Sequence, residues 1–217
     1  MRAIVAGASG LVGAQLVDLL LRDDEVRELV LLVRKPLAFD GRKVTQVIVD
    51  YGRLDAIAKE VSGDEVYVAL GTTMKTAGSR EAFRKVDFTC VVDLASLAAR
   101  NGVSRALFVS ASGADESSSV FYSRVKGEME AAVSALPFRG VGLFRPSFLV
   151  GDRKESRPGE RAGIAIASGL SFALVGPLRK LKPIDARAVA RAMVNVSRHG
   201  LSGTRVFESD EIQKLAG

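Results

Sequence analysis

The chain has 217 residues, of which 47% are hydrophobic and 26% are charged, and these values are typical of a globular protein with a packed core. A single cysteine excludes an intramolecular disulfide, and no Cys/His cluster that would hold zinc is present, so we expect no metal. The apolar run within the opening MRAIVAGASG is too short for a secretory signal or a membrane span. We therefore expect a cytoplasmic protein with no integral membrane segment.

The net charge is +6, and much of this excess lies between residues 151 and 191. A basic surface suits nucleic acid or an anionic membrane, but it also suits a solvated face or a site for a phosphorylated small molecule. Because the sequence contains no recognised nucleic-acid motif, we expect no nucleic-acid partner.

Apolar runs alternate with helical patterns over the first 150 residues. Strands are predicted over 2–7, 28–35, 44–50, 65–71, 105–112 and 141–150. Helices are predicted over 12–23, 80–100 and 119–136. The strands are continuous apolar runs, as expected when helices cover both faces of a sheet. The sequence therefore predicts an α/β fold in which residues 1–217 form a single-domain, doubly wound, Rossmann-like and mostly parallel sheet.

The pattern changes after residue 150. The polar GDRKESRPGER is predicted to be a loop. The glycine-broken apolar stretch 162–178 is predicted to pack over the sheet edge, with contact to a membrane surface as the alternative. A helix is predicted over 185–198, with Asp185 as its N-cap. We assign residues 147–185 to a small substrate or lid segment of the same domain.

The motif GASGLVG follows the first predicted strand and opens the first predicted helix. In a dinucleotide-binding fingerprint, Gly7 permits the tight turn, Gly10 lets the backbone approach a pyrophosphate, and Gly13 lets the helix pack close to the strand. The N-terminus of the helix would offer free N–H groups and partial positive charge to the phosphates. An ordinary glycine-rich turn is the alternative, but the order of strand, loop and helix favours cofactor binding.

The second predicted strand ends in LLVRKP, which indicates the type of dinucleotide. An enzyme that prefers NAD usually has an acidic residue there for the ribose 2′-hydroxyl. Arg34 and Lys35 stand there instead, and their charges suit the 2′-phosphate of NADP. A solvated basic turn is the alternative. We therefore predict NADPH, in preference to NADH, as the cofactor.

The segment FYSRVKGE places Tyr122 and Lys126 four residues apart, on one face of a predicted helix. That helix follows the fifth predicted strand, so its N-terminal end points to the sheet edge where the cofactor is expected. A nearby ammonium lowers the pKa of a phenol, so Tyr122 would exchange a proton with a substrate oxygen. Ser110 or Ser112, at the end of the preceding strand, would hydrogen-bond that oxygen. A surface tyrosine and lysine on an exposed helix face is the alternative.

Several motifs resemble, in order and spacing, those of the short-chain dehydrogenase/reductase family. The resemblance extends to the atypical subgroup of the HIV Tat-interacting tumour-suppressor oxidoreductase and its bacterial relatives. It rests on GASGLVG, ALGTT, SGADESS, FYSRVKGEME, FRPSFLVGDRKESRPGE and RAVARAMVN, which together cover most of the chain. The resemblance implies NADPH-dependent oxidoreductase chemistry with a tyrosine as acid and base.

The same resemblance implies which residues would contact the cofactor. Besides Arg34 and Lys35 on the 2′-phosphate, they fall into three groups. These are Ser9, Gly10, Leu11 and Val12 on the pyrophosphate, Leu70, Gly71 and Thr72 of ALGTT on the nicotinamide side, and Leu149 and Arg157 closing over the cofactor.

The resemblance also bears on catalysis. It implies Tyr122 and Lys126 as the catalytic pair, with Lys126 also on the nicotinamide ribose. The catalytic Ser or Thr of the broad family usually falls at the position of Ser112. In the atypical subgroup that this chain resembles, a Lys stands at the position of Ser112, and a Ser is kept only at the position of Ser110. The third catalytic residue is therefore Ser110 or Ser112.

Three further residues were weighed as parts of the site. Asp50, after the third strand, would face the adenine or cap the following helix. Asp87, early in the long helix, would contact the floor of the site or be a surface acid. Cys90 is expected in the core.

The sequence supports two hypotheses for function. In the first, the protein is an NADPH-dependent oxidoreductase that transfers a hydride to or from a small carbonyl or hydroxyl substrate. In the second, it is an NADPH-binding regulatory protein with a protein partner and little or no turnover. The serines, Tyr122 and Lys126 favour the first, because a pure binding module has no need of them. The chain is expected to be a monomer or a homodimer.

Overall fold

A seven-stranded parallel sheet forms the centre of the molecule in the computed structural model, which describes residues 1–39, 41–151 and 182–217. The strand order is β3-β2-β1-β4-β5-β6-β9, and every neighbouring pair is parallel. The strands are β1 (Arg2–Ala6), β2 (Glu28–Val33), β3 (Val44–Ile48), β4 (Glu65–Val68), β5 (Arg105–Val109), β6 (Gly140–Arg145) and β9 (Gly203–Glu208). The predicted Rossmann-like fold is therefore confirmed.

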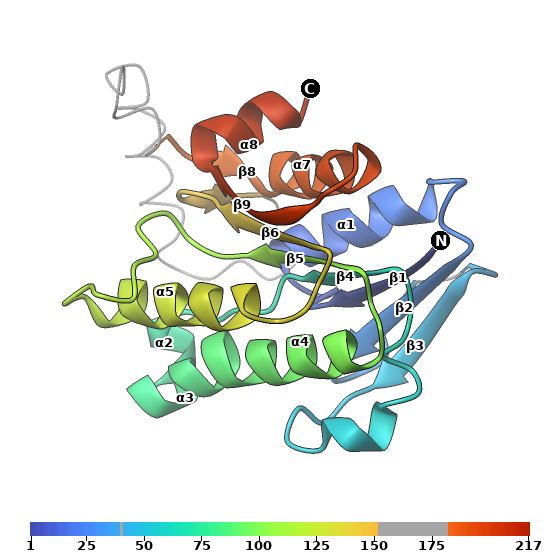
Figure 1. The fold of residues 1–217 in the computed structure, drawn as a ribbon, viewed down its shortest axis with the longest axis horizontal. Helices are drawn as coiled ribbons and strands as arrows, with labels where there is room; N and C mark the ends of the chain where they lie inside the picture. The colour runs from blue at the N-terminus through green and yellow to red at the C-terminus, as the bar shows by residue number, and fades with distance from the viewer. Residues whose placement is uncertain (40, 152–181) are drawn as a thin grey trace.

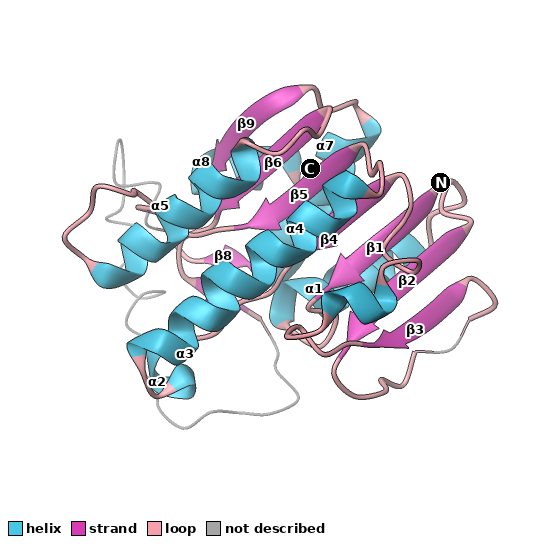
Figure 2. Cartoon of the chain, turned by 60° about the horizontal axis from the view of Figure 1, so that its bottom comes forward, coloured by secondary structure: helices cyan, strands magenta, loops and turns pink. Residues whose placement is uncertain are grey.

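Helices cover the sheet from both sides, as Figures 1 and 2 show. One layer contains α1 (Leu11–Leu21), α7 (Ala186–Arg198) and α8 (Ser209–Leu215). The other contains α3 (Arg80–Arg84), α4 (Cys90–Arg100) and α5 (Phe121–Ser134), with the short α2 (Met74–Ala77) beside α3. Neighbouring residues of one strand enter different cores: Ala3 and Val5 pack under α1, whereas Ile4 packs under α4. This two-sided burial explains why the strands are continuous apolar runs.

The turn between β1 and α1 is held by two glycines in contact. Gly7 has a φ of +89°, a backbone conformation that favours glycine. A Cβ added at Gly13 would lie 2.0 Å from the carbonyl oxygen of Gly7, which is far inside van der Waals contact. The predicted roles of Gly7 in the tight turn and of Gly13 in close helix packing therefore agree with the observed geometry.

Several strands end earlier than the sequence predicts. β1 ends at Ala6, β4 at Val68 and β5 at Val109, whereas the predictions ran to 7, 71 and 112. The strand predicted over 141–150 also ends early, because Pro146 has no N–H to continue the ladder. The chain resumes as β7 (Leu149–Val150), which pairs with β8 (Ile184–Asp185) in a separate two-stranded sheet.

The helix predicted over 80–100 is continuous but irregular. A π-helical turn, Lys85–Thr89, separates α3 from α4. Such turns hold one residue more than an α-helical turn and are frequent at functional sites. The turn directs Asp87 into the protein, where 1% of its surface is exposed.

The C-terminal part agrees with the sequence in one element and exceeds it in two. Asp185 caps α7, because its Oδ1 accepts a hydrogen bond from the backbone N–H of Arg187 at 2.7 Å. The sequence analysis missed β9 and α8, since GTRVFE has no continuous apolar run and most of β9 is exposed. In the three described ranges, no helix has the length and hydrophobicity needed to cross a bilayer. The stretch 162–178 lies outside the described residues.

The contact at Gly13 yields a stability prediction. Replacing Gly13 with Ala forces a carbon against the Gly7 carbonyl, and overpacking of this kind typically destabilises by about 1–3 kcal/mol. We expect a net loss of about 2 kcal/mol or more in the free energy of unfolding, measured by urea denaturation. Gly10→Ala is the control, because its Cβ would lie 3.2 Å from the same oxygen. Equal stability of the two variants would contradict the prediction.

Candidate functional site

The predicted site residues that the structure describes lie at the carboxyl edge of the sheet, where the strand order reverses. β1 lies between β2 and β4, so the loops after β1 and β4 leave the sheet side by side. A Cβ added at Gly7 would lie 2.5 Å from the carbonyl oxygen of Ala69, which places the two loops in contact. In open α/β sheets this crevice is where ligands bind.

The N-terminus of α1 faces this crevice with its first N–H groups uncapped. Gly10 is the N-cap, no side chain caps the helix, and the first turn contains no acidic residue. Such a terminus is a ready anion site because of its free N–H groups and partial positive charge. Ser9 is exposed and Leu11 is half-buried, whereas the side chain of Val12 is in the core. Only the backbone of Val12 is therefore available to a ligand.

Arg34 and Lys35 follow β2 beside the glycine loop. Ala6 pairs with Leu32, so the residues two further along each strand, Ala8 and Arg34, lie at a similar level. Both basic side chains are exposed and, among the described residues, neither forms an ion pair. They are therefore available to an external anion.

Asp50 and Tyr51 follow β3 at the same edge. Asp50 is exposed, and its Oδ1 accepts a hydrogen bond from the backbone N–H of Gly52 at 2.9 Å. It does not cap the following helical turn, whose N-cap is Arg53, so the capping alternative is wrong. The Tyr51 hydroxyl is buried without a hydrogen-bond partner in the described part of the chain. Burial raises the pKa of this phenol far above its usual range, with a smaller rise from Cys90 and an opposing effect of Arg34.

Tyr122 lies in the first turn of α5 with its ring against Phe83 of α3. The two ring centroids are 5.5 Å apart. Burial raises the pKa of the Tyr122 phenol, the positive charge of Lys126 lowers it, and the negative charge of Asp87 raises it again. The expected lowering by Lys126 is thus present, but burial outweighs it, and the expectation of a lowered pKa is wrong in its net result. The residue still keeps 36% of its surface exposed, so a substrate can reach it.

Lys126 is buried and paired with Asp87. Its Nζ lies 2.7 Å from Asp87 Oδ1, and the two side chains are only 5% and 1% exposed. The other carboxylate oxygen of Asp87 accepts a hydrogen bond from the backbone N–H of Thr72 at 2.8 Å. A Cβ added at Gly71 would lie 3.4 Å from Asp87 Oδ1 and 3.9 Å from Lys126 Nζ, so the pair sits beside Gly71. Asp87 is therefore an interior site residue and not a surface acid.

Two of the predicted serines, Ser110 and Ser112, follow β5 in different environments. Ser110 is buried, and its Oγ has no hydrogen-bond partner in the described part of the chain. Its backbone N–H donates to the carbonyl oxygen of Phe144 at 2.7 Å. Ser112 is half-buried, and its backbone N–H donates to the carbonyl oxygen of Pro146 at 2.9 Å. A buried hydroxyl without a partner is uncommon, and Ser110 thus has the capacity to bind a ligand.

The remaining predicted residues are Leu70, Leu149 and Arg157. Leu149 is half-buried in β7. A Cβ added at Gly151 would lie 3.5 Å from Leu11 Cδ2, which brings the end of this strand to the first turn of α1. Leu70 packs on the edge of the core. Arg157 lies outside the described residues.

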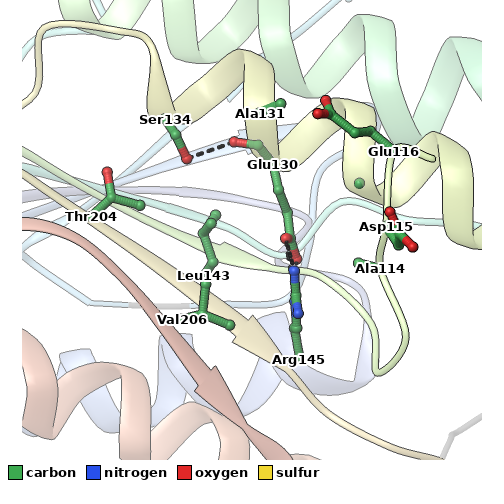
Figure 3. Close-up of a pocket in the computed structure, with 11 residues that line it drawn as sticks. Ala114, Asp115, Glu116, Glu130, Ala131, Ser134, Leu143, Arg145, Thr204 and Val206 are labelled. Carbon is green, nitrogen blue, oxygen red and sulfur yellow. Dashed lines mark hydrogen bonds and ion pairs between the residues drawn. The ribbon is translucent and has the colours of Figure 1, made fainter.

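The orientation of α5 is fixed by a separate ion-pair network. Glu130 is buried one turn after Lys126, and its Oε2 lies 2.5 Å from Arg145 Nη2 at the end of β6. Arg145 also pairs with Glu208 of β9 at 3.2 Å. Glu130 and Arg145 border an open depression of about 340 Å³ between α5 and the last two strands of the sheet (Figure 3). None of the predicted site residues in the described ranges lines this depression. We therefore assign the ion-pair network a structural role.

The sequence analysis missed the pairing of Asp87 with Lys126 and the contact of Phe83 with Tyr122. One signal for Asp87 was present. Phe83, Asp87 and Val91 are four residues apart, so the acid stands in the apolar stripe of the long helix. No local pattern indicates that its partner would be Lys126 of a different helix.

Comparison with known proteins agrees with this geometry. Residues 7–135 match the family described as NAD(P)H-binding. The chain belongs to this family. Within it, relatives that match most of the chain place it in the atypical short-chain dehydrogenase/reductase group. The matched region includes the glycine loop, both basic residues after β2 and the Tyr122–Lys126 pair.

Two relatives illustrate the extent of the match. A rat protein named HTATIP2 is 39% identical over 160 residues, which are 72% of this chain and 66% of the relative, just under two thirds of its length. A Candida albicans protein named FMP52, mitochondrial, is 32% identical over 228 residues, which cover 100% of this chain and 98% of the relative. Its name places that fungal protein in mitochondria, so the cytoplasmic location expected here stays a prediction.

Solved structures show the same fold at low sequence identity. MoeE5 in complex with UDP-glucose and NAD has a TM-score of 0.72 at 16% identity and covers 100% of this chain and 81% of its own. The UDP-glucose 4-epimerase of Thermotoga maritima has a TM-score of 0.70 at 14% identity, with the same coverage. These two structures support the fold and carry no argument about the substrate.

The buried ion pair yields a second stability prediction. Lys126→Met leaves the carboxylate of Asp87 buried and without its cation, and breaking a buried pair in this way costs about 3–5 kcal/mol. We expect a loss of this order in the free energy of unfolding by urea denaturation. Lys85→Met, at an exposed position of the adjoining π-helical turn, is the control and is expected within about 0.5 kcal/mol of the unchanged chain. A similar small change in Lys126→Met would show that the pair is not formed.

Proposed function

We propose that the protein is an NADPH-dependent oxidoreductase that reduces a small carbonyl compound or oxidises the corresponding alcohol. The observation that carries this proposal is the grouping of three chemical functions at the carboxyl edge of the sheet. Tyr122 offers an accessible phenol, Lys126 a buried ammonium, and Ser110 a buried hydroxyl without a partner. A module that only bound a nucleotide would have no use for this set.

The residues of the chain fit a bound NADPH. The uncapped N-terminus of α1 would receive the pyrophosphate, and Arg34 and Lys35 would hold the 2′-phosphate. Gly71 leaves space above the Asp87–Lys126 pair, since it has no side chain to cover it. When bound, NADPH would supply the hydride.

The protein residues would handle the proton and the substrate oxygen. In reduction, Tyr122 donates its phenolic proton to the carbonyl oxygen as the oxygen gains negative charge. Ser110 or Ser112 donates a hydrogen bond to the same oxygen and holds it in place. The charge of Lys126 stabilises the phenolate that remains. The burial of Ser110 Oγ favours this serine as an anchor, whereas Ser112 is the more accessible donor.

A second candidate function is an NADPH-binding regulatory protein with little turnover and a protein partner. The raised pKa of Tyr122 favours it, since burial makes this phenol a weaker acid than a free tyrosine. The two candidates share the cofactor and differ in whether the phenol takes part in chemistry. The state of the protein as monomer or homodimer and its location in the cytoplasm remain predictions under both.

The cofactor preference is testable by binding. A charge-assisted hydrogen bond to a phosphate is worth about 1.5–3 kcal/mol, so Arg34→Ala should weaken NADPH about 10- to 150-fold and leave NADH nearly unchanged. Thermal-shift titrations with both nucleotides provide the measurement. Arg27→Ala is the matched control, because Arg27 is exposed at the opposite end of the same strand. Equal shifts by NADPH and NADH in the unchanged chain would refute the 2′-phosphate assignment.

The role of Tyr122 is tested separately. Tyr122→Phe keeps the ring that packs on Phe83 and removes the proton donor. We expect NADPH affinity within about twofold and a loss of at least 10²-fold in the reduction of a panel of small aldehydes and ketones. Oxidation of NADPH is followed by its absorbance. Unchanged turnover would remove Tyr122 from the mechanism, and no turnover by the unchanged chain would favour the regulatory function.

A further inference from the structure

The ion pair of Asp87 with Lys126 has a second effect, on the charge felt by Tyr122. Lys126 stands one helical turn after Tyr122 on α5, and its positive charge favours the phenolate. The carboxylate of Asp87 lies 2.7 Å from that ammonium and opposes it. The charge that reaches the phenol is therefore that of a pair and not that of a lone cation.

We infer that Asp87 is a positioning residue that holds Lys126 in place while offsetting its positive charge at Tyr122, so that the phenol stays protonated and the site favours carbonyl reduction over alcohol oxidation. This inference rests on the proposed role of Tyr122 as the proton donor. It assigns a direction of reaction, which the proposed function leaves open.

The geometry gives Asp87 little freedom to do anything else. One carboxylate oxygen accepts the backbone N–H of Thr72, and the other faces Lys126 Nζ. With 1% of its surface exposed, the carboxylate exchanges little with water.

The other charged groups around Tyr122 are occupied elsewhere. On α3, Arg80 lies 5.2 Å from the ring centroid of Phe121, and Arg84 pairs with Glu128 of α5. Arg124 of α5 donates to the carbonyl oxygen of Ser118 at 2.8 Å. Within the described ranges, the charges that act on the phenol are those of Asp87 and Lys126.

The protonation state of Tyr122 decides whether the site supports reduction of the carbonyl or oxidation of the alcohol. In reduction, the carbonyl carbon gains a hydride from NADPH while the O–H bond of Tyr122 breaks and its proton passes to the oxygen, giving an alcohol and NADP⁺. Solvent then returns a proton to the phenolate. Oxidation of the alcohol needs the phenolate as base at the start. With Asp87 ionised, the neutral phenol persists to higher pH, and this favours reduction.

Asp87→Asn tests the inference, because it removes the charge and keeps both the volume and an oxygen for the Thr72 N–H. The ionisation of Tyr122 is followed in the full chain by the ultraviolet absorbance of tyrosinate. Subtracting the curve of the same protein carrying Tyr122→Phe isolates this phenol from Tyr51 and Tyr67. We expect the midpoint to move to lower pH in Asp87→Asn. The alkaline fall of kcat/KM for carbonyl reduction should move in the same direction.

The matched control is Asp93→Asn, an exposed acid on α4 that should leave the midpoint unchanged. If the midpoint of Tyr122 ionisation in Asp87→Asn is unchanged or higher than in the unchanged chain, the inference is overturned. The titration needs no substrate. If the midpoint falls but the unchanged chain reduces no carbonyl, the charge assignment stands and the proposed oxidoreductase function fails.

If Asp87→Asn does not fold, the double variant with Lys126→Met decides the question, because it leaves no buried ion unpaired. When the two charges offset each other at Tyr122, removing both should leave the midpoint near that of the unchanged chain. If Asp87 does not offset Lys126, removing both is equivalent to removing the cation alone. A clear rise of the midpoint would then overturn the inference.

Discussion

The contact between Gly13 and the carbonyl of Gly7 is the constraint on which the site depends. It brings the first turn of α1 so close to the end of β1 that no side chain would fit between the two backbones. The uncapped N–H groups of the helix are thereby placed at the point where the strand order reverses. The same turn touches the loop after β4, so both of the loops that border the crevice are positioned by one piece of backbone.

The opposite wall of the crevice is organised by charge in place of close packing. Asp87 is brought inside by the π-helical turn and meets Lys126, which α5 supplies. Glu130, further along α5, is held by Arg145 of β6, so the helix that carries Tyr122 is tied to the sheet. The acid of each pair is buried, which means that α5 has few alternative positions. The backbone of Tyr122 is therefore held in one position relative to the sheet.

The sequence predicted the parts of the molecule that depend on local pattern. The strands, the glycine loop and the cap at Asp185 have signals within a few residues, and the order of strands and helices restricts the topology to few choices. The predicted strands extend past the observed strand ends. The residues in these extra positions include the predicted site residues Gly7, Leu70, Gly71 and Ser110. Apolar composition continues there while the backbone turns away to form the site.

The remaining parts depend on contacts between distant segments. Asp87 and Lys126 lie on different helices, and nothing near either residue in the sequence names the other. The direction in which the pKa of Tyr122 is shifted could not be predicted from the Tyr-x-x-x-Lys spacing, because it depends on burial and on a third residue, Asp87. β9 was missed because an edge strand with an exposed face needs no apolar run.

The π-helical turn between α3 and α4 also determines how this helix can vary in evolution. Because the turn holds one residue more than an α-helical turn, removing one residue between 85 and 89 would restore a regular α-helix and leave α3 and α4 in nearly the same relative orientation. Phe83 would stay near Tyr122, but the turn that directs Asp87 toward Lys126 would be lost. Exposed positions such as Lys85 and Thr89 accept other residue types at little expense. The segment is thus open to substitution and closed to insertion or deletion.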